Sequence, residues 1–136
     1  MTVHLPDQLK KFLDDTVFIV VGTVQPDGSP QLSPVWVKRD GDDLLFSTLA
    51  DNRKARNLLR DPHVSVIVQP FDSPYTYAEI RGTASLDRSG GRALIDELTR
   101  KYTGHATYTD LNGGVPEQGE RVAVRITPRK IVGNLG

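Results

Sequence analysis

Short segments rich in β-branched and aromatic residues, each closed by a turn signal, constrain the fold of this chain more than any other feature. Residues 17–24 are followed by Pro26-Asp27-Gly28, where proline presets φ and glycine accepts a positive φ. Residues 31–38 are likewise followed by Asp40-Gly41-Asp42, and residues 43–48 come after that turn. Because strands joined by such short turns pair antiparallel, the pattern predicts a β-meander of two hairpins.

The rest of the chain adds elements of the same modest length. Apolar residues at helical spacing predict helices over residues 6–15 and 51–60, and a third helix capped by Ser89. Alternating segments predict strands over residues 63–69, 75–86 and 121–127, with Gly82 as a bulge and residues 130–132 as a short apolar tail. Residues 103–118 have no clear periodicity and are expected to form a long loop.

These elements predict a mainly β (α+β) fold, a closed or split antiparallel β-barrel of about six strands with short flanking helices. A chain of 136 residues is expected to form one domain over residues 1–136. Its zero net charge gives no global field that would attract nucleic acid or acidic membranes.

Composition also indicates the cellular compartment of the protein. The chain has no cysteine, which excludes disulfides, thiolate metal sites and cysteine nucleophiles. Residues 1–15 are too polar for a secretory signal, and the longest apolar run, residues 17–22, is too short to cross a bilayer. We therefore expect a soluble, cytoplasmic protein without membrane insertion.

The segment that follows the third strand is typical of an anion site. Ser47 and Thr48 end the strand, and Arg53 and Lys54 fall in the first turn of the helix that follows. Cations at a helix N-terminus oppose the macrodipole, whereas an anion bound there is favoured by the free backbone N–H groups. The segment therefore favours a bound phosphate, and the alternative is a solvated basic helix face.

The same helix predicts a basic stripe that extends outward from this site. Arg53, Arg56 and Arg60 recur at helical intervals on one face, and residues 55, 58 and 59 are expected to turn to the core. Lys38 and Arg39 would join the stripe if the second hairpin folds as predicted.

The motif Ser47-Thr48, then Asn52-Arg53-Lys54-Ala55, then Leu58-Leu59 and Asp61-Pro62 resembles the pyridoxamine 5′-phosphate oxidase-like superfamily of split β-barrel flavin or deazaflavin proteins. Asp27-Gly28-Ser29-Pro30-Gln31 and Tyr75-Thr76-Tyr77-Ala78 are most similar to the branch that uses the deazaflavin coenzyme F420. The resemblance implies that Arg53, Lys54 and the preceding hydroxyls hold the cofactor phosphate. It also implies a homodimer with cofactor sites at the subunit interface.

Other positions have implied roles and ordinary alternatives. By resemblance, Lys38 gives a further positive contact to the phosphate, although a lysine at a strand end is often solvated. The strand that ends at Trp36 would pass under the cofactor ring, whereas Trp36 itself is more simply a core anchor. Tyr75, Thr76, Tyr77 and Ala78 would line the cofactor site, the alternative for the two tyrosines being cross-strand packing on one face of their strand.

Several chemistries lack their motifs. His4, His63 and His105 share no metal-ligand spacing, and the chain has no dinucleotide fingerprint, phosphate-binding loop or nucleophile elbow. No pair of carboxylates stands out as an acid–base set. This does not exclude an enzyme, because flavin-type cofactors carry the hydride themselves.

The sequence thus predicts a homodimeric F420-dependent oxidoreductase that reduces a small planar electrophile such as a quinone, tetrapyrrole or enone. One alternative is a flavin mononucleotide (FMN) protein. The Trp and Arg-Leu-x-Pro ending that would resemble the site of the true oxidase is missing, and this disfavours the alternative. The other is a non-catalytic cofactor carrier.

Overall fold

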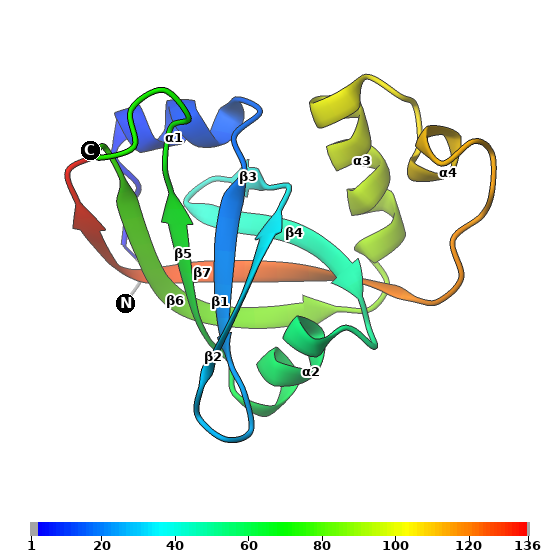
Figure 1. Cartoon of the computed structure of the whole chain (residues 1–136), viewed down its shortest axis with the longest axis horizontal. Coiled ribbons are helices and arrows are strands. Elements are labelled where there is room, and N and C mark those ends of the chain that lie inside the picture. Colours follow the sequence, from blue (N-terminus) through cyan, green and yellow to red (C-terminus); the bar gives the residue numbers. More distant parts are fainter. Residues whose placement is uncertain (1–2, 136) are drawn as a thin grey trace.

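The computed structural model describes residues 3–135, which form seven strands and four helices (Figure 1). In chain order the elements are α1 (Asp7–Asp14), β1 (Ile19–Val24), β2 (Pro30–Val35), β3 (Lys38–Asp40), β4 (Asp43–Leu49), α2 (Arg53–Arg60), β5 (His63–Val68), β6 (Ala78–Asp87), α3 (Gly91–Thr103), α4 (Tyr108–Leu111) and β7 (Arg121–Gly133).

All strand pairs are antiparallel, in the order β2-β1-β5-β6-β7-β4-β3. The sheet curls into an open barrel with β2 and β3 at its two edges, so the predicted mainly β, split-barrel fold is confirmed (Figure 1). The strand count exceeds the prediction because residues 31–38 do not form one strand. The predicted meander is therefore wrong, and β1–β2 and β3–β4 are two separate hairpins. The chain leaves the sheet at Trp36 and Val37, and the pieces on either side belong to opposite edges.

Alternation along the strands builds the core. Inward-facing residues such as Ile19, Phe46, Ile80 and Val124 are fully buried, and their burial is the main source of stability in a fold of this kind. Helix α1 adds Leu9 and Leu13, both fully buried, to the same cluster. In Figure 1, α1 and α2 lie on opposite sides of the barrel, while α3 packs against β4 and β7.

Helix α2 follows the sequence prediction in part. Ala55 and Leu58 are buried as expected, but Leu59 is exposed. Asn57 takes the third inward position, where its amide donates to Thr23 Oγ1 at 3.0 Å and Gln25 Oε1 at 3.2 Å. A polar side chain is stable inside because β1 and its turn supply the acceptors.

The second half of the sheet differs from the prediction at strand ends. Strand β6 begins at Ala78 instead of residue 75, and its register shift between Arg81 and Gly82 is the predicted bulge. Strand β7 extends to Gly133 and includes the segment expected to be a separate tail. The loop over residues 103–118 contains the single turn of α4.

Ser89 does not cap α3 as predicted. Its hydroxyl and backbone N–H both bind Asp87 Oδ1, and Gly90 occupies the N-cap position. Gly91 starts the helix against the backbone of Arg121, where a Cβ atom would lie 2.2 Å from the Arg121 carbonyl carbon. Only glycine permits this approach.

Within residues 3–135, none of the helices has the length and apolar character that a membrane crossing requires.

Candidate functional site

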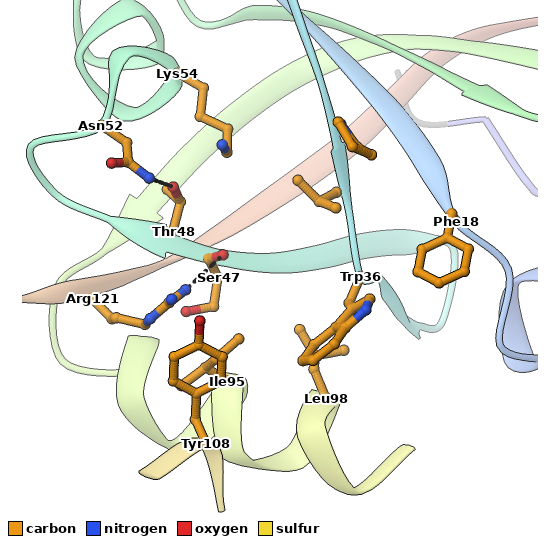
Figure 2. A pocket seen from close by; sticks show the side chains of 12 residues that line it. Phe18, Trp36, Ser47, Thr48, Asn52, Lys54, Ile95, Leu98, Tyr108 and Arg121 are labelled. Carbon is orange, nitrogen blue, oxygen red and sulfur yellow. Dashed lines mark hydrogen bonds between the residues drawn. The ribbon is translucent and has the colours of Figure 1, made fainter. Parts of the chain in front are cut away.

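A cavity of about 370 Å³ opens where the end of β4 meets the start of α2, the β2–β3 break and the inner face of α3 (Figure 2). One end is polar and cationic, and the other is apolar and aromatic. Its lining consists of Phe18, Pro34, Val35, Trp36, Ser47, Thr48, Asn52, Lys54, Ile95, Leu98, Tyr108 and Arg121.

The two hydroxyls at the end of β4 differ in what they can donate. Ser47 Oγ donates to the carbonyl of Gly91 at 2.9 Å, so its single proton is already used. Thr48 Oγ1 accepts from the amide of Asn52 at 3.0 Å, which leaves its proton for a ligand. Asn52 holds the N-cap position of α2 but makes no side-chain cap, so the first-turn N–H groups lack that partner.

Lys54 is the cation at this end of the cavity. Its side chain is half-buried and points into the cavity (Figure 2), and it makes no hydrogen bond or ion pair within residues 3–135. Burial lowers the pKa of Lys54 below its ordinary value, and the nearby charge of Arg121 lowers it further. A half-buried ammonium without a counter-charge is an incomplete arrangement that an anion completes.

Arg121, the first residue of β7, is held from three sides. Glu117 accepts from its Nε at 2.7 Å and its Nη2 at 2.9 Å, and Nη1 donates to the Ser47 carbonyl at 3.3 Å. The ring of Tyr108 covers one face, with its centroid 4.7 Å from the guanidinium carbon. Hydrogen bonding to Arg121 lowers the pKa of Glu117, to which Arg92 also donates at 2.9 Å.

The apolar end is built around Trp36, which the break between β2 and β3 directs into the cavity. Its ring stacks on Tyr102 of α3 with centroids 5.3 Å apart and planes at 13°. Trp36 is half-buried, and it lines the cavity instead of anchoring the core.

A family model for pyridoxamine 5′-phosphate oxidase matches residues 5–134. The chain belongs to the pyridoxamine 5′-phosphate oxidase family. Similar solved structures include an F420 reductase, 27% identical over 94% of this chain and 98% of its own length, with a TM-score of 0.80. A conserved hypothetical protein of Mycobacterium tuberculosis is 25% identical over 96% of this chain and 84% of its own length, with a TM-score of 0.76.

A pyridoxamine 5′-phosphate oxidase-like protein of Listeria innocua shares the fold, at 22% identity over 96% of this chain and 98% of its own length, with a TM-score of 0.68. The family match confirms the superfamily resemblance. It assigns the chain to a split-barrel family that binds flavin-type cofactors and includes oxidoreductases.

The structure brings three of the predicted site residues together, Ser47, Thr48 and Lys54. Arg53 and Arg56 lie on the exposed face of α2, outside the lining. Lys38 pairs with Glu97 at 2.5 Å and borders a separate cavity between α3 and the sheet.

Arg39 is drawn away to α1, where it binds Asp14 at 2.8 Å. The prediction that Arg39 joins the basic stripe on α2 is therefore wrong. The stripe loses Arg60 as well, because that side chain turns to the carbonyl of Val24 and the amide of Asn57.

Residues 75–78 lie outside this cavity. Tyr75, Thr76 and Tyr77 precede β6, so the two tyrosines are not neighbours on one strand face, and Tyr75 is 87% exposed. Asn134 holds this segment by accepting from the Tyr77 backbone N–H at 2.9 Å and donating to the Tyr75 carbonyl at 3.0 Å. Ala78 is buried as the first residue of β6. A role for these four residues in cofactor binding stays a prediction.

Sequence reasoning missed Asn52 as a ligand-facing residue and the whole contribution of Arg121, Tyr108 and Phe18. One signal was present, because Glu117 and Arg121 have the i,i+4 spacing of a salt-bridge pair. Their place at the cavity depends on the β4–β7 register, which sets Leu49 opposite Arg121. Within residues 3–135, no group of three side chains is arranged to hold a metal ion.

Proposed function

We propose that this protein binds reduced coenzyme F420 in the cavity and transfers a hydride to a small planar electrophile of the quinone, tetrapyrrole or enone type. One observation carries the proposal: Lys54 is half-buried at the cationic end of a cavity whose other end is apolar and aromatic. A ligand that joins a phosphate to a flat ring system fits both ends.

The donors at the cationic end suit a phosphate. Lys54 offers three N–H bonds, Thr48 offers its hydroxyl proton, and the first turn of α2 offers uncapped backbone N–H groups. Arg121 contributes charge and its remaining N–H bonds, since Glu117 occupies only one edge of the guanidinium. These donors suit a phosphate group, and no acidic side chain of residues 3–135 lines the cavity beside Lys54.

The apolar end suits the ring. The edge strand β2 forms one wall with Pro34 and Val35, and α3 forms the other with Ile95 and Leu98. Both walls are apolar and exclude water from a flat ligand. The reduced deazaflavin, when bound, supplies the hydride, and the chain supplies orientation, shielding and charge.

The choice of F420 over flavin mononucleotide rests on charge beyond the phosphate. F420 carries a lactyl–oligoglutamate tail, and Arg53 and Arg56 lie exposed beside the start of α2, where such a tail would leave the cavity. The 27% identity to a protein described as an F420 reductase supports the same choice. Flavin mononucleotide, which has no such tail, would fill both ends of the cavity without reaching Arg53 or Arg56.

A homodimer belongs to the same proposal. Large apolar side chains are exposed outside the cavity at Ile67, Phe71 and Tyr75, and an exposed set of this kind favours a protein partner. We propose that a second copy covers this surface. Residues 75–78 would then contribute to the cofactor site of the partner instead of their own.

The test is the absorption spectrum of the purified protein before and after addition of each cofactor, followed by turnover assays with reduced F420 and quinone, enone and tetrapyrrole acceptors. We expect tight binding of F420 and hydride transfer to at least one acceptor class. Flavin bound during expression, with no affinity for F420, would support the flavin alternative. F420 binding with no turnover on any acceptor would support the carrier.

A further inference from the structure

Three aromatic rings from distant parts of the chain meet at the apolar end of the cavity. Phe18 directly precedes β1, Trp36 lies in the β2–β3 break, and Tyr102 is in the last turn of α3. Tyr102 stacks on Trp36 at 5.3 Å between centroids and meets Phe18 at 5.8 Å in a tilted arrangement. Figure 2 shows Phe18 and Trp36 on the side of the cavity away from Lys54.

The hydroxyl of Tyr102 ties down the backbone next to each of the other two rings. It donates to the carbonyl of Val17, one residue before Phe18, at 2.5 Å. It also accepts from the N–H of Val37, one residue after Trp36, at 3.1 Å. One side chain therefore sets the separation between Phe18 and Trp36, because it fixes both chain segments that carry them.

Lys101 strengthens this anchor from the same helix turn. Its Nζ donates to the carbonyls of Leu13 and Val37, both at 2.7 Å, and lies 5.0 Å from the centroid of the Tyr102 ring. Lys101 and Tyr102 thus hold the β2–β3 break, which carries Trp36, against α3. A ring held in this way offers a fixed surface to a ligand, which reduces the entropy lost on binding.

The chemistry of this surface selects an uncharged, flat ligand. Phe18 is 65% exposed and Trp36 half-buried, so both remain accessible at the opening of the cavity. The neighbouring lining is apolar, with the charged side chains confined to the opposite end. Offset stacking on such rings favours conjugated systems over saturated ones.

We propose that Phe18 and Trp36, at the rim of the apolar end, form the subsite for the hydride acceptor, and that Tyr102 is the positioning residue that holds this subsite in shape. The walls formed by β2 and α3 remain for the cofactor ring. The acceptor class is a neutral conjugated carbonyl compound. The inference rests on the proposed function for the reaction, but the subsite itself is defined by binding and is tested without turnover.

Trp36 is the sole tryptophan of the chain, so tryptophan fluorescence reports on the end of the cavity that holds this subsite. We would titrate the purified protein, with and without F420, with menadione as a flat quinone probe and with cyclohexanone as a saturated control. Saturable quenching by menadione, absent with cyclohexanone, is expected. Quenching that rises linearly, as for free tryptophan amide, would overturn the proposal.

Two variants test the role of Tyr102. Tyr102→Leu removes the stack and the hydroxyl, and should raise the menadione Kd about three- to tenfold while the F420 Kd stays unchanged. Tyr102→Phe retains the stack and loses only the hydroxyl, and should have an intermediate effect even if the leucine variant folds poorly. Leu59→Ser, which changes an exposed residue outside the cavity, is the matched control.

The outcomes separate this inference from the proposed function. Unchanged menadione affinity in both Tyr102 variants would overturn the positioning role, as would an equal loss of F420 affinity, which would indicate a general structural effect. Failure of the wild-type protein to bind F420, with menadione binding intact and sensitive to Tyr102, would contradict the proposed function and leave the subsite established.

Discussion

Arg121 lies close enough to Lys54 for its charge to lower the pKa of the lysine, in addition to the larger effect of burial. Two cations thus share one end of a cavity, and Glu117, which also binds Arg92, pairs with Arg121 and not with Lys54. The fold tolerates this repulsion because the β4–β7 register and the start of α2 fix both backbones. An anion between them would relieve the repulsion, and this relation underlies the first two predictions.

Replacing Lys54 with alanine should weaken cofactor binding by about 1.5–3 kcal/mol, the usual range for a hydrogen bond to a charged group. Folding stability should change little, because Lys54 has no partner to lose within residues 3–135. Fluorescence quenching titrations would measure the affinity. Arg88→Ala is the control, since Arg88 is an exposed cation outside the cavity. Equal affinities in wild type and Lys54→Ala would refute the assignment.

Cofactor affinity should decline at a lower pH than it would if Lys54 had the pKa of an ordinary lysine. Anion binding requires protonated Lys54, whose pKa in the folded protein lies below 10.5, so affinity is full below that lowered pKa and falls as pH rises through it. Titrations from neutral pH to about pH 10 would show the decline. In Lys54→Arg, whose side chain stays charged, the decline should disappear; identical profiles in both proteins would contradict the role of Lys54.

The same shift has a separate effect on the ligand-free protein. Between the folded and unfolded pKa values of Lys54, the unfolded chain binds more protons. The contribution of Lys54 to the free energy of unfolding therefore increases as pH rises through that interval.

Glu117→Gln should lower the free energy of unfolding by about 1.5–3 kcal/mol at neutral pH, because it weakens the charged hydrogen bonds to Arg121 and Arg92. The folded pKa of Glu117 is lowered from 4.5, so its contribution is complete above that value and is lost as pH falls through the folded pKa. Urea unfolding at several pH values should show the wild-type and variant curves converging in acid. Glu120→Gln, at an exposed pair, is the control; a constant difference down to low pH would contradict this account.

F420 should bind more tightly than flavin mononucleotide, and its advantage should shrink as salt rises. The extra charges of its tail would interact with the exposed Arg56 and Arg53, and exposed pairs are screened over about 8 Å at physiological ionic strength and about 3 Å at 1 M. Parallel titrations at low and high salt, repeated with Arg56→Ala, would measure this. Tighter binding of flavin mononucleotide at every salt concentration would favour the flavin alternative.

Sedimentation equilibrium should give twice the 15.0 kDa mass of the chain at micromolar concentration. Phe71, whose side chain is fully exposed in the single chain, should be covered in the dimer. Phe71→Asp should therefore shift the equilibrium toward monomer, whereas Val115→Asp, at another exposed apolar residue, should not. A wild-type protein that stays monomeric would remove the proposed role of residues 75–78 in a partner site.

Local chemistry determined the parts of the fold that the sequence predicted. The Gly28 and Gly41 turns and the β-branched segments around them fixed the first hairpins, and Ala55 and Leu58 fixed the buried face of α2. The predicted site residues that line the cavity, Ser47, Thr48 and Lys54, lie within one strand–helix connection. Their geometry follows from a few neighbouring residues.

The remaining features depend on contacts that no local pattern contains. The break at Trp36 exists because barrel closure assigns its two flanks to opposite sheet edges. Tyr75 and Tyr77 are held outside the strand by Asn134, nearly sixty residues away. Arg121 reaches the cavity through strand pairing with Leu49. Each depends on long-range pairing that one-dimensional periodicity does not encode.

The position of β7 in the sheet has a consequence for synthesis of the chain. This strand lies between β6 and β4, and it is the last strand in the sequence. A nascent chain on the ribosome therefore holds two separate pieces of sheet, β2-β1-β5-β6 and β3-β4, with an unpaired edge on each. Such edges invite pairing with other chains. The interval before β7 emerges is thus the stage of synthesis at which edge-to-edge aggregation is most favoured.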